Sequence, residues 1–286
     1  MSIVVTAATG QLGRHVVEQL LARGVGPAQV VATGRSLDRL TDLAERGVRT
    51  RLLDYDDPAT IEAALNAGDT VLLVSGPDVG RRVAQHRAVL DAARQVGVAR
   101  LAYTSALAAD RSALPVAPDH VATENDIRAS GLPFTFLRNG WYTENYAPVA
   151  QQAAATGTVI SSAGDGRVAS ATRQDFAAAI AAALATDGHE GKIYELSGDE
   201  AWTFDDLADA LSTLLGREVH YQRVSPEEHL SILREAGLDD ETAEFLVAID
   251  RNIRDGALAI QTGDLSRLAG RPSTPLVDGL RPLVGS

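Results

Sequence analysis

The chain has 286 residues, of which 45% are hydrophobic, and a formal net charge of −12. This length holds one large domain, or a nucleotide-binding domain with a smaller one appended, and the hydrophobic content suffices for a full core. The absence of cysteine excludes disulfides, thiolate catalysis and cysteine-bound metals. The negative charge argues against nucleic acid as a partner, because phosphate binding needs a basic surface.

No signal-peptide pattern precedes the first predicted strand, and no apolar run approaches the ~18 residues that a membrane span needs. We therefore expect a cytoplasmic protein without a membrane span, and leave a homodimer open as its assembly. The six histidines show no metal-ligand spacing such as HExxH, so we predict no metal site.

The first fourteen residues carry the main signal. Residues 2–6 form an apolar, β-branched strand pattern, Ala7–Gly13 form a small-residue turn, and a helical period follows to Gly24. This strand–turn–helix order predicts a dinucleotide-binding unit whose N–H groups hold a pyrophosphate, and the binding candidates are Thr9, Gly10, Gln11 and Leu12. The alternative is an ordinary connecting turn. Ala7 stands where glycine is usual, and we expect a backbone dihedral there that tolerates a Cβ.

Strands and helices then alternate. We predict strands at 29–33, 48–53, 70–74, 100–104 and 134–138, with helices at 37–43, 57–65, 83–96 and 119–130. Such regular alternation predicts an α/β fold with a doubly wound parallel sheet. We assign residues 1–140 to the nucleotide-binding domain. Residues 141–286 form a smaller α/β lid and substrate domain, partly interleaved with the main sheet, with extended pieces at 159–161, 168–169 and 219–224, a strand at 192–196, and helices at 175–185, 203–216 and from Ser225.

Ligands of doubly wound sheets lie beyond the carboxyl ends of the strands. That rule gathers one crevice from Gly10–Leu12, Arg35, Asp54, Ser75-Gly76, Thr104-Ser105 and Asn139–Tyr142. The second strand ends at Gly34-Arg35, without the acidic residue that binds the ribose of NAD. A guanidinium binds a 2′-phosphate bidentately, so Arg35 favours NADPH over NADH. The alternative is a solvated loop arginine.

Lys192 is the only lysine, which excludes both a P-loop and the Tyr-x-x-x-Lys pair of short-chain dehydrogenases. His120 and Glu124 have the spacing of that missing pair, although a helix-surface ion pair is an equal alternative. No catalytic residue is certain. Ser105 and His120 are weak candidates, and the serine could equally cap its strand.

Further candidates for cofactor binding are Asp54, Ser75, Gly76, Thr104 and Asn139, all at strand ends. For the substrate, the candidates are His86, Trp141 and Tyr142. The two aromatic rings could stack on a planar ligand, and the Asn139 amide could bind a carboxamide or a quinone oxygen. The competing interpretations are a packed or solvated histidine and aromatic packing at a domain interface.

Several motifs resemble one family over essentially the whole chain. They are Thr6–Gly13, Arg35, Gln85–Arg87, Tyr103–Ser105, Leu137–Tyr146 (LRNGWYTENY), Gly164–Gly166, Gly188–Lys192 and Gly270–Pro272. The sequence resembles the NmrA-like atypical short-chain dehydrogenases, and within them the NADPH-dependent quinone oxidoreductase 2 type. The LRNGWYTENY stretch is the specific signal. The family pattern has glycine where this chain has Ala7.

The resemblance implies a Rossmann-like NADPH domain and quinone reduction in the cleft beside a small C-terminal domain. Two other functions stay open at this point. One is a non-catalytic NmrA-like regulator that senses its nicotinamide cofactor and binds a protein partner. The other is a reductase of a different activated acceptor, such as an enone or a nitroaromatic.

Overall fold

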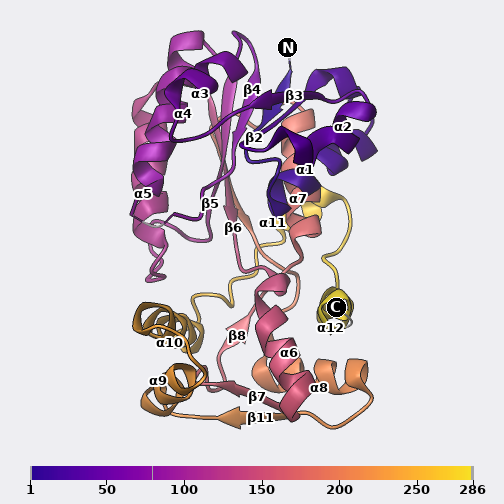
Figure 1. Ribbon diagram of the computed structural model, residues 1–286, viewed down its shortest axis with the longest axis vertical. Coiled ribbons are helices and arrows are strands. Elements are labelled where there is room, and N and C mark those ends of the chain that lie inside the picture. The colour runs from indigo at the N-terminus through magenta and orange to yellow at the C-terminus, as the bar shows by residue number, and fades with distance from the viewer. Residues whose placement is uncertain (1, 79, 285–286) are drawn as a thin grey trace.

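The computed structural model describes residues 2–78 and 80–284. Its main body is a seven-stranded sheet in the order β3-β2-β1-β4-β5-β6-β9 (Figure 1). Each neighbouring pair is parallel. The strands are β1 (Ile3–Val5), β2 (Val30–Gly34), β3 (Arg49–Leu52), β4 (Thr70–Leu73), β5 (Arg100–Ala106), β6 (Phe134–Asn139) and β9 (Lys192–Leu196). The predicted Rossmann-like parallel sheet is confirmed.

Helices cover both faces of this sheet. One face packs against α1 (Gln11–Ala22), α7 (Arg173–Ala185) and α11 (Asp264–Ala269). The other packs against α3 (Pro58–Ala64), α4 (Arg82–Val96) and α5 (Ala117–Ala129). Where one helix was expected at 37–43, a 3-10 turn at Leu37–Leu40 precedes the short α2 (Thr41–Glu45). Strand order reverses between β1 and β4, which places a crevice at their carboxyl ends.

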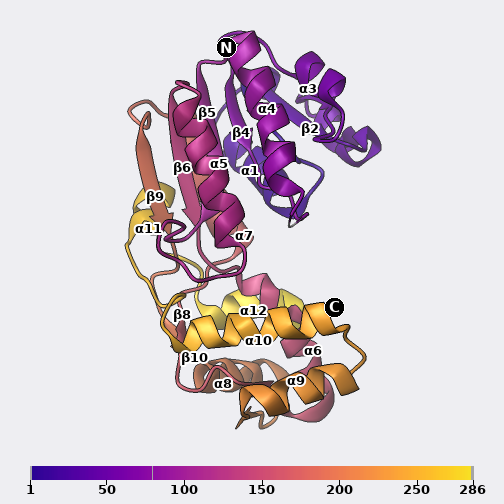
Figure 2. The same cartoon turned by 90° about the vertical axis from the view of Figure 1, so that its left-hand side faces the viewer.

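A second, smaller body lies below the sheet (Figure 2). Two strand pairs belong to it: β7 (Thr158–Ser161) runs parallel to β11 (His220–Arg223), and β8 (Arg167–Val168) runs antiparallel to β10 (Trp202–Thr203). Its helices are α6 (Ala147–Thr156), α8 (Phe204–Leu215), α9 (Pro226–Glu235), α10 (Asp240–Arg254) and α12 (Leu276–Val284). The sequence pattern did not predict α6, α10, α11 or α12.

The second half of the chain contributes to both bodies. After β8 the chain returns to the main sheet as α7 and β9, and it returns again later as α11. Every residue of α7 from Asp175 to Leu184 is buried, and most are alanines, which lets this helix pack closely on α1. Among the described residues, no helix is long and apolar enough to cross a bilayer.

The glycine-rich turn joins β1 to α1 by close backbone contact. The Gly10 N–H donates to the Ala7 carbonyl at 2.9 Å, and the Ala8 N–H donates to the Thr33 carbonyl at 2.7 Å. A Cβ on Gly13 would lie 2.5 Å from the Ala7 oxygen, a distance that forces the helix away from the turn. Ala7 has φ +48°, in the left-handed region that favours glycine. Our expectation of a dihedral compatible with a Cβ is therefore wrong.

This strain predicts a stabilising substitution. Replacing Ala7 by glycine removes a backbone strain of about 1–2 kcal/mol from the folded state. It also costs about 0.5–1 kcal/mol, because glycine loses more conformational entropy on folding than alanine does. We expect the free energy of unfolding to rise by up to about 1 kcal/mol in urea titrations. Ala8→Gly is the matched control: this neighbour is fully buried and lies outside the left-handed region, so it should destabilise. A lower stability for Ala7→Gly would contradict the strain.

Candidate active site

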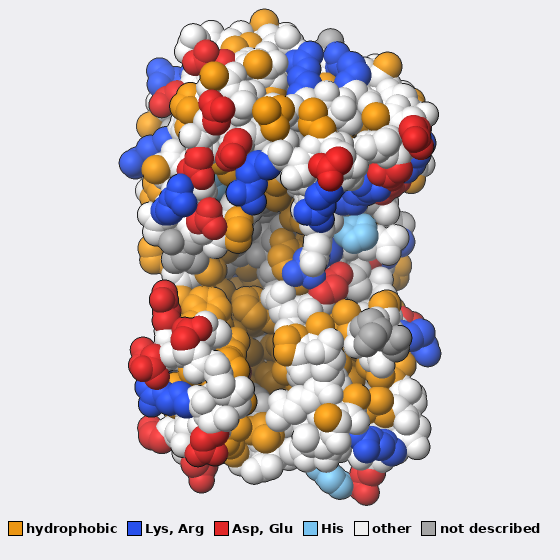
Figure 3. Space-filling view, viewed as in Figure 1, with side chains coloured by type: hydrophobic (Ala, Val, Ile, Leu, Met, Phe, Trp, Pro, Cys, Tyr) orange, Lys and Arg blue, Asp and Glu red, His pale blue; other side chains and the backbone are white. Residues whose placement is uncertain are grey.

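Three cavities follow the carboxyl ends of the strands, and Figure 3 shows the hollow between the two bodies with hydrophobic side chains along its walls. The first cavity, of ≈ 250 Å³, lies over β1, β2 and β4. Its walls include the predicted residues Thr9, Gly10, Arg35, Asp54, Ser75 and Gly76. A Cβ on Gly34 would lie 2.5 Å from the Thr9 side chain, so glycine at this strand end lets the turn approach β2.

The second cavity, of ≈ 350 Å³, continues along the start of α1. Thr9, Gly10 and Gln11 line it, together with Arg14, His15, Arg39, Glu144 and Arg173. Gly10 caps α1 without any side-chain hydrogen bond, and no acidic residue stands in the first turn. The first N–H groups of α1 therefore face a cavity with cations on its walls, which suits a phosphate anion. The Leu12 side chain instead packs into the core.

The third cavity, of ≈ 140 Å³, lies between the two bodies. It contains seven predicted residues: Ser75, Thr104, Ser105, His120, Asn139, Trp141 and Tyr142. Leu107, Leu114, Val116 and Leu258 add an apolar wall. Asn139 donates from Nδ2 to the Tyr142 hydroxyl at 3.1 Å. Its Oδ1 is buried and has no partner among the described residues, so this acceptor is available to a ligand N–H or O–H.

Comparison with known proteins identifies the family. The sequence model of a protein family described as NAD(P)H-binding matches residues 7–187. The chain is 43% identical to quinone oxidoreductase 2 of Escherichia coli over 98% of both chains. It is also 30% identical to an NmrA-like family domain-containing oxidoreductase of Aspergillus flavus, over 99% of this chain and 95% of that protein. The chain belongs to the NmrA-like NAD(P)H-binding family.

Two solved structures share the fold of this family member. The NADPH complex of the E. coli quinone oxidoreductase superposes with a TM-score of 0.93 and covers 98% of this chain and 99% of that one. The NADP(H) complex of the Citrobacter triphenylmethane reductase is 38% identical, with a TM-score of 0.92 over 99% of this chain and 100% of that one.

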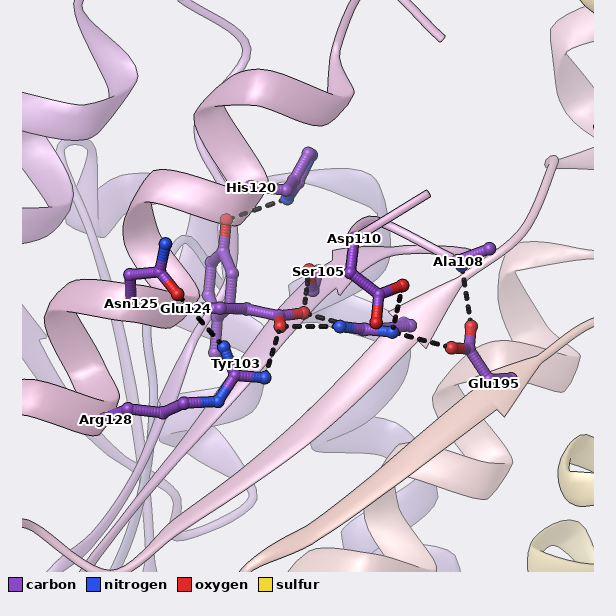
Figure 4. Close-up of polar contacts among 10 residues, drawn as sticks. Tyr103, Ser105, Ala108, Asp110, His120, Glu124, Asn125, Arg128 and Glu195 are labelled. Carbon is purple, nitrogen blue, oxygen red and sulfur yellow. Dashed lines mark hydrogen bonds and ion pairs between the residues drawn. The ribbon is translucent and has the colours of Figure 1, made fainter. Parts of the chain in front are cut away.

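A buried ionic network lies behind the third cavity (Figure 4). The Arg138 guanidinium donates to both Glu124 oxygens, each at 2.8 Å, and to Glu195 Oε1 at 2.8 Å. The Ser105 hydroxyl donates to Glu124 Oε1 at 2.7 Å. Burial raises the pKa of Glu124, but the hydrogen bonds from Arg138 and Ser105 outweigh it and lower that pKa overall. Since its proton is held by Glu124, Ser105 faces the cavity as an acceptor.

His120 is buried and its ring nitrogens are both engaged. Nε2 lies 3.4 Å from Arg82 Nη1, and Nδ1 lies 2.8 Å from the Tyr103 hydroxyl. A guanidinium only donates, so Nε2 accepts and Nδ1 carries the proton. Burial and the nearby Arg82 lower the pKa of His120 to about 3. His120 therefore presents a neutral ring, and the alternative of a surface ion pair with Glu124 is wrong because both side chains are buried and bind other partners.

His86 supports the cavity from behind. It is 1% exposed. The Gly76 N–H donates to its Nε2 at 3.2 Å, and its Nδ1 lies 3.0 Å from the Thr123 hydroxyl. Burial and the neighbouring His120 lower the pKa of His86 to about 3. The structure thus places the predicted substrate residue His86 under the Ser75-Gly76 loop and outside the three cavity walls, in agreement with the packed alternative.

Several wall residues were not predicted from the sequence. Arg39 lines the first two cavities, and Gln85 lines the first. Gln85 had a signal, since it stands in one of the motifs shared with the family. Glu144 and Arg173 line the second cavity, yet Arg173 lies far along the chain from the glycine turn. Only the packing of α7 on α1 brings the two together, and no local pattern reports that packing.

The neutral, buried imidazoles predict how stability depends on pH. The folded-state pKa values of His86 and His120 are about 3, below the ordinary 6.5, so the unfolded chain binds protons first as the pH falls. Their contribution is complete above about pH 6.5 and is lost towards about pH 3. Each histidine adds a slope of about 1.4 kcal/mol per pH unit.

We expect His120→Asn to reduce this slope by about 1.4 kcal/mol per pH unit between about pH 6 and pH 4, measured by urea unfolding. His220→Asn is the control, because the side chain of His220 is 67% exposed, and it should leave the slope unchanged. Equal slopes for wild type and His120→Asn would contradict a neutral, buried His120.

Proposed function

We propose that the protein reduces quinones by transfer of a hydride from NADPH. The supporting observation is an acceptor cavity, bounded by the strand ends and an apolar wall, whose titratable side chains are poor acids. The Ser105 proton is held by Glu124, and His120 is neutral with both nitrogens engaged. Burial raises the pKa of Tyr142, the remaining titratable group on the wall. A ketone reductase needs a positioned proton donor, whereas a quinone does not.

The cleft residues fit NADPH. The uncapped start of α1 suits the diphosphate, and Arg35 and Arg39 supply cations for the 2′-phosphate in a protein of net charge −12. The Gln85 Oε1 atom is buried without a partner among the described residues, and it lines the first cavity. An orphaned acceptor of this kind suits a donor on the ligand. Bound there, NADPH supplies the hydride.

The protein's part in this reaction is positional. Hydride addition gives an aromatic hydroquinone anion of low basicity, which water can protonate. The wall residues then need only hold the two rings face to face, and proximity of that kind strongly accelerates a reaction. Trp141 and Tyr142 offer aromatic surface, and the Asn139 Oδ1 atom accepts from the carboxamide or the product hydroxyl. We place this reaction in the cytoplasm.

One assay separates this function from the alternatives. NADPH consumption is followed by its absorbance across a panel of quinones, with an enone, a nitroaromatic and a triphenylmethane dye as other activated acceptors. Turnover with quinones supports the proposal. A preference for another acceptor would instead identify the protein as a reductase of that acceptor. The regulator alternative predicts no turnover and equal affinity for reduced and oxidised cofactor.

Arg35 should set the choice of cofactor. A charge-assisted contact to the 2′-phosphate is worth about 1.5–3 kcal/mol, so Arg35→Ala should weaken NADPH binding at least about tenfold. Binding of NADH, which lacks that phosphate, should stay nearly unchanged in the same calorimetric titration. Equal losses for both cofactors would show that Arg35 only supports its loop.

Turnover should be insensitive to the two weak catalytic candidates. Ser105→Ala and His120→Ala should each lower quinone turnover by less than about tenfold, below the ~100-fold or more that a general acid contributes. Aliphatic ketones should be poor substrates, since their reduction produces a basic alkoxide. A loss of turnover beyond about a hundredfold in either variant, with NADPH binding intact, would contradict a mechanism that needs no general acid from the protein.

A further inference from the structure

The second cavity is lined by an arginine from the far half of the chain. Arg173 is the first residue of α7, and it lines this cavity together with Gly10 and Gln11 of the α1 start. The helices α1 and α7 pack side by side on one face of the sheet (Figure 1). The packing that buries the alanines of α7 therefore also brings a cation to the glycine turn.

Arg173 is held in one orientation. Its guanidinium carbon lies 4.6 Å from the centre of the Tyr142 ring, a distance typical of cation–π stacking. Its Nη2 donates to Asn145 Oδ1 at 3.3 Å. The side chain is only 18% exposed. A fixed guanidinium of this kind loses little conformational freedom when it binds a ligand.

The charge of Arg173 is only partly used by the protein. The Glu144 carboxylate accepts from the backbone N–H of Arg173 at 2.9 and 3.2 Å. Its Oε2 lies 3.6 Å from Arg173 Nη1, longer than a charge-assisted hydrogen bond. Glu144 thus occupies the first N–H of α7, and the guanidinium keeps N–H donors for a second anion.

The other cations of this cavity are placed differently. Arg14 pairs with Asp42 and donates to the Arg39 carbonyl at 3.0 Å. Arg39 lines the first cavity as well as the second, beside Arg35. That position suits the 2′-phosphate end of the cofactor. Arg173 lines the second cavity only, among the three described here.

We propose that Arg173 binds the diphosphate of the nicotinamide cofactor and that Tyr142 and Glu144 orient it. The inference rests on the proposed binding of NADPH. It adds a cation from α7 to a diphosphate site otherwise built from the β1–α1 turn. Because Tyr142 also accepts from Asn139, the residue that orients Arg173 at the diphosphate is the same one that borders the acceptor cavity.

Calorimetric titration of Arg173→Gln with three ligands tests the assignment. NADPH and NADH both carry the diphosphate, so both should lose at least about tenfold in affinity. Adenosine 2′-monophosphate carries only the 2′-phosphate and should bind within about twofold of wild type. Arg35→Ala is the matched control with a different pattern, in which NADPH and adenosine 2′-monophosphate lose affinity and NADH does not.

Arg173→Lys keeps the charge but lacks the planar, stacked guanidinium, so it should recover only part of the NADPH affinity that Arg173→Gln loses. NADPH affinity of Arg173→Gln within about threefold of wild type would overturn the inference, and so would an equal loss in the lysine variant. A loss of adenosine 2′-monophosphate binding would reveal damage to the whole cleft and likewise overturn a direct role. Failure of the wild type to bind NADPH would instead overturn the proposed function.

Discussion

The buried charge of Arg138 is the constraint on which the active-site side of the molecule depends. Its side chain is 4% exposed, and a guanidinium so far from water is tolerated only when it is paired and hydrogen-bonded. Glu124 of α5 and Glu195 of β9 accept from it, and Asp110 accepts a further hydrogen bond at 3.1 Å. One side chain of β6 therefore ties together a helix, the edge strand and the loop that follows β5.

That tie has consequences for the acceptor cavity. Glu195 also accepts from the backbone N–H of Ala108 at 2.7 Å, and Ala108 has φ +50°, a conformation that costs about 1–2 kcal/mol for alanine. The network thus holds the loop that carries Leu107, Leu114 and Val116 of the apolar wall. It also takes the proton of Ser105. The need to pair the buried Arg138 charge therefore holds the loop beside the cavity. It also leaves the Ser105 hydroxyl without a free proton for a ligand.

In the proposed complex, the cleft offers different surroundings to the two ends of the cofactor. At the first two cavities the chain offers backbone N–H groups and arginines, which bind phosphates through charge and geometry. At the third cavity it offers aromatic surface, aliphatic side chains and one orphaned amide oxygen. In the proposed complex the arginines of the cleft face the phosphates, and the walls beside the reacting ring carry apolar and neutral polar side chains. Such a site suits hydride transfer to an acceptor that stabilises its own negative charge.

The parallel sheet and the edge where the site lies follow from local sequence patterns. Strand and helix periods are local, and the carboxyl ends of parallel strands meet at one edge. The alternation of strands and helices therefore suffices to place Gly10, Arg35 and Asn139 at one edge of the sheet, where the structure assigns the first two to one cavity and Asn139 to another. The absence of a Tyr-x-x-x-Lys pair can also be read directly from the sequence.

Three features depend instead on contacts between segments far apart in the chain. They are the φ of Ala7, the burial of His120 and Glu124, and the position of Arg173 beside the glycine turn. A local pattern contains no record of the neighbour that desolvates a side chain or of the helix that lies beside it. For that reason the sequence indicates the edge of the sheet where the candidate residues lie, and the fold determines their burial and their hydrogen bonds.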